Sequence, residues 1–171
     1  MNVRQGTPAD LPLILELGAR TFFDAYKDLA DREELMIHIT QTFTESNFLP
    51  EFADPNTHFL IAEVDGLPIG FAQLCVGKST ECVSGESPIF LARIYLDQTE
   101  VGKGYGSALM RSCIETAESL CGRTLWLAVW EQNTRAIRFY KRWGFRFSGT
   151  YAFQYAGETV EDLVMVRSIG K

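Results

Sequence analysis

The sequence predicts an α/β fold in which helices cover both faces of a mixed sheet. Strand-like and helix-like segments follow one another in the order βααβββαβαββ, which builds such layers. Residues 125–130 are apolar almost throughout, as expected of a strand that is covered on both faces. A chain of 171 residues, 46% hydrophobic and 22% charged, can bury one good core. We therefore expect a single domain over residues 1–171.

Local patterns predict each element in turn. Apolar residues at a period of 3.6 indicate helices, and β-rich runs between turn residues indicate strands. Asp65-Gly66 is a strong hairpin signal. The N-terminal elements are a strand over 2–5, a helix capped by Thr7, a helix capped by Asp31 and a helical turn over 46–52. The remaining elements are strands 57–64, 69–76 and 89–96, a helix over 108–120 stopped by Gly122, strand 125–130, a helix between Asn133 and Gly144, and strands 145–155 and 160–167 with a turn near Ala156-Gly157.

Composition excludes several classes of function. The formal net charge of −6 argues against a nucleic-acid partner, because binding phosphates needs a basic surface. No apolar run approaches the length of a membrane span, and the first residues lack a secretory core, so we expect a cytoplasmic protein with no membrane partner. The four cysteines lack metal-ligand spacing; Cys75 and Cys113 are expected to be buried thiols, and no metal is expected.

A glycine-rich turn, residues 101–107, joins an apolar strand to a helix. Such a turn leaves backbone N–H groups unpaired at the positive end of the helix dipole, where a phosphate can bind. No Gly-Lys-Ser/Thr triplet closes the turn, and Ser107 replaces the third glycine of a dinucleotide fingerprint. Taken alone, the glycines fit close packing as well as phosphate binding.

The turn and the residues that follow it resemble the GNAT superfamily of acetyl-CoA-dependent N-acyltransferases. That family has Arg/Gln-x-x-Gly-x-Gly/Ala after a strand, then an Asn and a Tyr on a later helix. Here the glycines are Gly104 and Gly106, the later residues are Asn133 and Tyr140, and Val101 replaces the usual Arg/Gln. The resemblance is greatest to bacterial polyamine (spermidine/spermine) acetyltransferases, through Thr21-Phe22-Phe23-Asp24, Arg93-Ile94-Tyr95 and Trp126-Leu127-Ala128-Val129-Trp130-Glu131.

The resemblance implies a mostly antiparallel sheet, acetyl-CoA as acetyl donor and a specific set of contacts. It assigns to coenzyme A the backbone of Ile94, Tyr95 and Leu96, the loop residues Gly102, Lys103, Gly104, Tyr105, Gly106 and Ser107, and the Asn133 side chain. It implies that Tyr140 is the general acid that protonates the leaving thiolate, since a phenol with a pKa near ~10 is protonated at neutral pH. The structural alternative is a tyrosine packed on the sheet.

The acceptor side is predicted from charge. Residues 24–54 hold eight carboxylates against two cations, a net −6 that equals the charge of the whole chain and would attract a polycation. The substrate candidates are Phe22, Phe23, Asp24 and Tyr26. The general base is unassigned, and His38 and His58 are candidates by chemistry alone.

The sequence thus predicts an N-acetyltransferase that moves acetyl directly to a primary amine, a polyamine in the first instance. We expect a monomer or a homodimer. Two alternatives stay open: acetylation of a protein N-terminus or lysine, which an open groove would favour, and a non-catalytic coenzyme A sensor, which would have no need of Tyr140.

Overall fold

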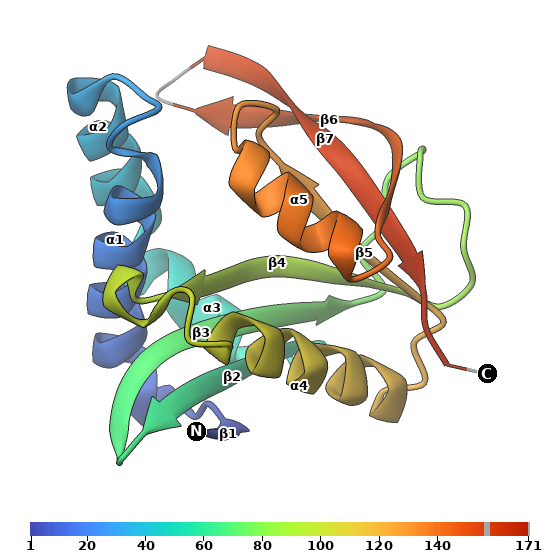
Figure 1. Cartoon of the computed structure of the whole chain (residues 1–171), viewed down its shortest axis with the longest axis horizontal. Coiled ribbons are helices and arrows are strands. Elements are labelled where there is room, and N and C mark those ends of the chain that lie inside the picture. The colour runs from blue at the N-terminus through green and yellow to red at the C-terminus, as the bar shows by residue number, and fades with distance from the viewer. Residues whose placement is uncertain (156–157, 171) are drawn as a thin grey trace.

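A computed structural model describes residues 1–155 and 158–170. Within them, seven strands form one sheet in the order β1-β2-β3-β4-β5-β7-β6 (Figure 1). All neighbours are antiparallel except β4 and β5, which confirms the mixed, mostly antiparallel sheet. The strands are β1 Asn2–Gln5, β2 Thr57–Val64, β3 Leu67–Val76, β4 Pro88–Leu96, β5 Thr124–Val129, β6 Arg146–Tyr155 and β7 Glu158–Ser168.

Helices cover both faces of the sheet, as predicted. One face carries α4 and α5, whose apolar residues pack with Leu91, Leu127 and Met165 in the largest buried cluster. The other face carries α1 and α3, which bury Phe48, Phe59 and Phe71 with them; α2 lies beside α1 (Figure 1). The helices are α1 Leu11–Tyr26, α2 Arg32–Thr42, α3 Glu45–Ala53, α4 Tyr105–Ser119 and α5 Thr134–Arg142, with 3₁₀ turns η1 Pro8–Asp10 and η2 Gln98–Glu100.

The parallel strands β4 and β5 pair over a short stretch and then separate. Their register joins Pro88, Ile89 and Phe90 to Thr124, Leu125 and Trp126, and no later residue of β4 pairs with β5. Beyond this point β4 keeps its pairing with β3 and β5 keeps its pairing with β7. The sheet therefore opens between its two central strands.

A β-bulge at Ala92 sets which face the end of β4 presents. Gln73 of β3 pairs with Arg93, and the next residue, Leu74, pairs with Leu91, so Ala92 is the extra residue. An extra residue reverses the alternation of side chains along a strand. Leu91 therefore packs on the α4 face, whereas Arg93 and Tyr95 lie on the face that carries α1 and α3.

Element boundaries differ from the predicted ones in a few places. The segment predicted as a short turn is a full helix, α3, which Thr44 caps by accepting a hydrogen bond from the Asn47 N–H. Helix α4 ends because Cys121, rather than Gly122, takes the left-handed conformation, with φ +59°. Gly122 is needed for space, since a Cβ there would lie 2.6 Å from the Ile89 side chain. The predicted turn at Ala156-Gly157 lies outside the described residues.

Candidate active site

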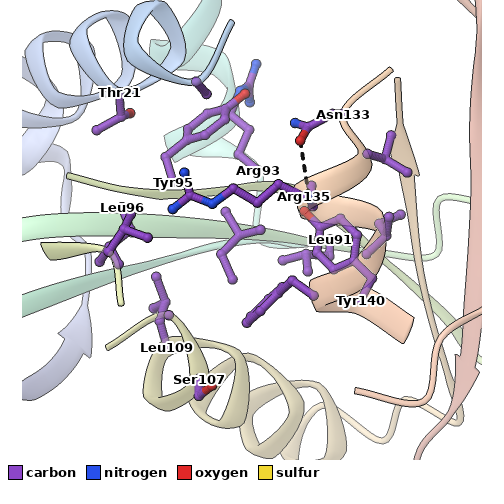
Figure 2. Close-up of a pocket in the computed structure, with 18 of the residues that line it drawn as sticks. Thr21, Leu91, Arg93, Tyr95, Leu96, Ser107, Leu109, Asn133, Arg135 and Tyr140 are labelled. Atoms are coloured by element: carbon purple, nitrogen blue, oxygen red, sulfur yellow. Dashed lines mark hydrogen bonds between the residues drawn. The ribbon is translucent and has the colours of Figure 1, made fainter. Parts of the chain in front are cut away.

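A cavity of about 500 Å³ lies where β4 and β5 separate. Leu109 and Tyr140 line it from the α4 and α5 face, and Thr21 and Tyr26 line it from α1 on the opposite face (Figure 2). Residues 91–96 of β4 and 127–129 of β5 form its walls. The opening in the sheet thus connects two faces that an ordinary sheet would separate.

The glycine loop forms one end of this cavity, at the beginning of α4. Gly104 is the N-cap of α4 with φ +88°, and Gly102 has φ +89°. A Cβ at either position would meet nothing within 4 Å, so open space lies over the loop. Gly106 and Ser107 also line the cavity. Positive φ explains why glycine is needed, and the free N–H groups of the first turn can bind an anion.

Two predicted loop residues turn away from the cavity. Lys103 forms an ion pair with Glu100 (Nζ to Oε1, 3.0 Å), and the Tyr105 ring packs against the main core. Neither lines the cavity. The side chains of Lys103 and Tyr105 therefore stabilise the loop, and only the backbone of these two residues can contact a ligand there.

Asn133 and Tyr140 lie on one face of α5, as their spacing predicted, and both line the cavity (Figure 2). Asn133 caps the helix, with its Oδ1 accepting a hydrogen bond from the Ala136 N–H at 3.1 Å. Burial raises the pKa of the Tyr26 phenol of α1, and the nearby Asn133 side chain lowers it by a smaller amount. Asn133 therefore lies close to α1 across the opening.

The Tyr140 phenol is protonated at neutral pH. Burial raises its pKa well above the usual value, and the neighbouring Tyr26, Tyr95 and Cys113 add to the shift. The Tyr140 ring stacks edge-on against Phe139 and Phe145 at centroid distances of 5.6 and 5.8 Å. A fixed, protonated hydroxyl in a cavity wall can donate a proton to an anion that forms beside it.

The four substrate candidates on α1 divide into two groups. Tyr26 lines the cavity, whereas Phe22, Phe23 and Asp24 do not. Phe22 packs behind the wall, 4.5 Å from the Tyr26 ring and 5.0 Å from that of His38. The Phe23 ring lies under the guanidinium of Arg32, and Asp24 forms an ion pair with Lys27.

Three arginines in the cavity wall were missed in the sequence. Arg135 and Arg142 come from α5, and Arg135 contacts Gln98 beside the glycine loop (Nη1 to Oε1, 3.5 Å). Arg93 comes from β4, where its guanidinium binds Glu51 at 3.0 Å and also the side chain of Gln73. Arg135 is two residues from Asn133, a spacing that places the two on different faces of a helix. The Ala92 bulge that turns Arg93 toward α3 has no sequence signal.

These residues fit the thioester and the phosphates of coenzyme A. The α4 N-terminus and Arg135 offer donors and positive charge at one end of the cavity, and the unpaired edge of β4 faces the narrow passage through the sheet. Apolar side chains of Leu91, Leu109 and Leu127 lie between them. A long molecule with an anionic end and an apolar middle matches that order of groups.

The model of the acetyltransferase (GNAT) family matches residues 15–145. The chain belongs to this family. It is an N-acetyltransferase, and acetyl-CoA is its acetyl donor. Among solved structures, PaiA N-acetyltransferase from Thermoplasma acidophilum in complex with coenzyme A has a TM-score of 0.80 at 21% identity, covering 98% of each chain. That likeness extends over the whole acetyltransferase fold.

Relatives in sequence are N-acetyltransferases as well. An uncharacterized N-acetyltransferase from Mycobacterium tuberculosis is 29% identical over 160 residues, covering 94% of this chain and 98% of that protein. A spermine/spermidine N(1)-acetyltransferase from Bacillus subtilis is 29% identical over 100 residues, covering 58% of this chain and 66% of that protein. In the described part of the acetyltransferase, no helix is both long enough and apolar enough to cross a membrane.

Proposed function

We propose that this acetyltransferase moves acetyl directly from acetyl-CoA to a primary amine of a polyamine such as spermidine or spermine. The observation that carries the proposal is the cavity that passes through the sheet between β4 and β5. The donor would enter on the α4 and α5 side, the amine on the α1 side, and the two would meet at the passage.

Direct transfer is supported by the side chains around the passage. Cys113 lies near Tyr140, but burial raises the pKa of its thiol to about 12, so it is not a thiolate at neutral pH. Without a thiolate there, an acyl-enzyme on that sulfur is disfavoured. The amine nitrogen therefore attacks the acetyl carbonyl itself, the new N–C bond forms as the C–S bond breaks, and the Tyr140 phenol protonates the sulfur.

The backbone of β4 has a role in the same step. Beyond Phe90, no described residue pairs with β4 on its β5 side, so the N–H groups on that edge can donate to a ligand. The assignment of Ile94, Tyr95 and Leu96 to this role rests on the family resemblance and on their place in the cavity wall. A donor fixed at the carbonyl oxygen stabilises the negative charge that develops there.

A polyamine acceptor is supported by charge and by a relative. The corner between α1 and α2 exposes Asp28, Asp31, Glu33 and Glu34. Asp31 and Glu34 act on the Tyr155 phenol, so their field extends to the end of β6 beside α2. A negative field at the rim attracts a polycation and weakens as salt increases. The Bacillus subtilis relative carries the name of a polyamine acetyltransferase.

The test is a turnover screen with acetyl-CoA at low and high salt. We expect spermidine and spermine to have higher kcat/KM than butylamine or a peptide with a free N-terminus, and the preference to shrink as salt is raised. If the peptide is the better substrate, the acceptor is a protein. Equal turnover of butylamine at low salt would remove the acidic corner from substrate selection.

A further inference from the structure

One half-buried carboxylate, Asp162, lies on the face of the sheet from which the amine is proposed to enter. Asp162 lies on β7, where alternate residues face opposite sides of the sheet. Leu163 and Met165 pack on the α4 face, whereas Val164 and Val166 pack with Trp126 on the other. By this alternation Asp162 projects on the face that carries α1.

The register places Asp162 at the opening of the sheet. Its neighbour Leu163 pairs with Val129, the last residue of β5, so Asp162 lies one step beyond the end of that strand. The Tyr26 ring lies 6.1 Å from that of Trp130, which follows β5 directly. The charge of Asp162 acts on the phenols of both Tyr26 and Tyr95, two residues of the cavity wall.

Asp162 also differs from the other half-buried carboxylates. Asp10 is paired with Arg4, Glu51 with Arg93 and Asp97 with Arg20. No hydrogen bond or ion pair joins the Asp162 carboxylate to another residue in the described part of the chain. Burial alone raises its pKa to about 6, and part of its surface stays open to solvent. An unpaired, half-buried carboxylate is costly, and a ligand cation would relieve the cost.

We propose that Asp162 binds the ammonium group of the acceptor and is the first to receive its proton. This inference rests on the proposed function, in which the acceptor is a primary amine. Tyr26 would lie on one side of the ammonium group and the acetyl group at the passage beyond it. The residue is not among those that the sequence predicted for the acceptor.

Proton transfer to Asp162 makes the amine reactive. An alkyl ammonium with a pKa near ~10.4 has no lone pair, and only about 0.1% is free base at neutral pH. One proton passes from the ammonium to the Asp162 carboxylate and then to water. The second leaves the nitrogen as the N–C bond forms and the C–S bond breaks, and it balances the proton that Tyr140 gives to the sulfur. The products are an amide, a thiol and one proton released to solvent.

Other titratable groups on this face must be separated from Asp162 in a pH profile. They are Tyr26 of α1, Tyr95 and Arg93 of β4, Tyr155 of β6 and His38 of α2. The three phenols all have raised pKa values and stay neutral. Burial and Arg93 lower the pKa of His38, so it titrates on the acid side of its ordinary range. Among the described groups on this face, His38 is therefore the one that could imitate Asp162.

The experiment compares wild type with Asp162→Asn, using Glu161→Gln and His38→Gln as controls. Glu161 is an exposed carboxylate on the same strand and points to the opposite face. We expect Asp162→Asn to lower kcat/KM for spermidine by ~10²–10⁴-fold and to remove an acid limb near pH 6. Both controls should keep that limb. The Kd of acetyl-CoA should stay within a few fold for every variant.

Binding separates this inference from the proposed function. Calorimetry with spermidine, in the presence of coenzyme A, measures the ammonium site without turnover. If wild type acetylates none of the amines, the proposed function fails; weaker spermidine binding by Asp162→Asn than by Glu161→Gln would still support the ammonium site. Equal spermidine binding, or a kcat/KM within threefold of wild type and an unchanged pH profile, would overturn the role of Asp162.

Discussion

For Tyr140, a packing role and a catalytic role predict different effects of substitution on the rate. Tyr140→Phe keeps the ring that packs on Phe139 and Phe145, so packing alone predicts little change. Loss of a general acid predicts a fall in kcat of ~10²–10⁴-fold with a nearly unchanged Kd for acetyl-CoA. Steady-state kinetics and calorimetry measure the two quantities. Tyr151→Phe, on β6 and outside the cavity wall, is the matched control.

Replacing Asp162 with asparagine is expected to lower activity but to raise stability. Its pKa is raised from 3.8 to about 6, so the folded state favours the neutral form, and wild type loses stability as pH rises through that window. Asp162→Asn should be more stable than wild type at pH 8, by about 1–2 kcal/mol after allowance for solvent screening. The gain should disappear toward pH 4. Urea unfolding at both pH values measures it, and a less stable variant at pH 8 would mean that the carboxylate has a stabilising partner.

Single residues were predictable where one helix carries the whole pattern. Asn133 and Tyr140 are seven positions apart on α5, and helical geometry alone places them together. Asp162 and Tyr26 belong to opposite ends of the chain, and no local pattern indicates that the charge of one acts on the other. Arg93 was not predicted because the alternation that assigns a face to a strand residue is reversed by the bulge at Ala92.

The role of the glycine loop at 101–107 can be tested by comparing Gly104 with a similar glycine in another turn, Gly66. Gly104 and Gly66 both have positive φ, +88° and +79°, and a Cβ at either would meet nothing within 4 Å. Aspartate at either position costs about 1 kcal/mol in backbone strain. Only Gly104→Asp adds a negative charge at the α4 N-terminus, so it should abolish the rise in melting temperature caused by acetyl-CoA. Gly66→Asp, in the β2–β3 turn, should keep that rise; tight binding by Gly104→Asp would contradict the loop assignment.

Helix α5 provides a cation beside the loop where Val101 replaces the family's Arg/Gln. Arg135 reaches Gln98 from the cavity wall, whereas Arg138 is exposed on the same helix and does not line the cavity. We expect Arg135→Gln to weaken acetyl-CoA binding about tenfold at low salt and to leave acetyl-pantetheine, which has no pyrophosphate, unaffected. Arg138→Gln should change neither. If Arg135→Gln weakened the binding of acetyl-CoA and acetyl-pantetheine equally, Arg135 would not contact the phosphates.

At the level of elements, the sequence predicted types and order better than boundaries. Helix α4 begins at Tyr105, three residues before the predicted start, because the loop residues themselves form its first turn. Its end was assigned to Gly122, the expected residue for a left-handed position, yet Cys121 takes that conformation. Conformational preference favours glycine at the left-handed position, but Gly122 packs against Ile89, and Cys121 takes that conformation instead.

For the whole molecule, the sheet and its helical layers followed from the pattern of apolar residues. The separation of β4 and β5 did not, because both strands are apolar and either could continue to pair. The resemblance to the family assigned the backbone of Ile94, Tyr95 and Leu96 to coenzyme A, and the register of the strands provides the geometry. Long-range pairing depends on what lies across the sheet, which no window of the sequence contains.

The short pairing between β4 and β5 also divides the sheet mechanically. Only three residue pairs of the described strands join β1–β4 to β5–β7–β6. Amides at the free edge of β4 should therefore exchange hydrogen with solvent through small local openings, long before the protein unfolds as a whole. A ligand that bridges the gap acts as a removable cross-link between the two halves. Acetyl-CoA should slow exchange most at residues 91–96, as measured by mass spectrometry, and protection confined to the 101–107 loop would mean that the donor does not span the gap.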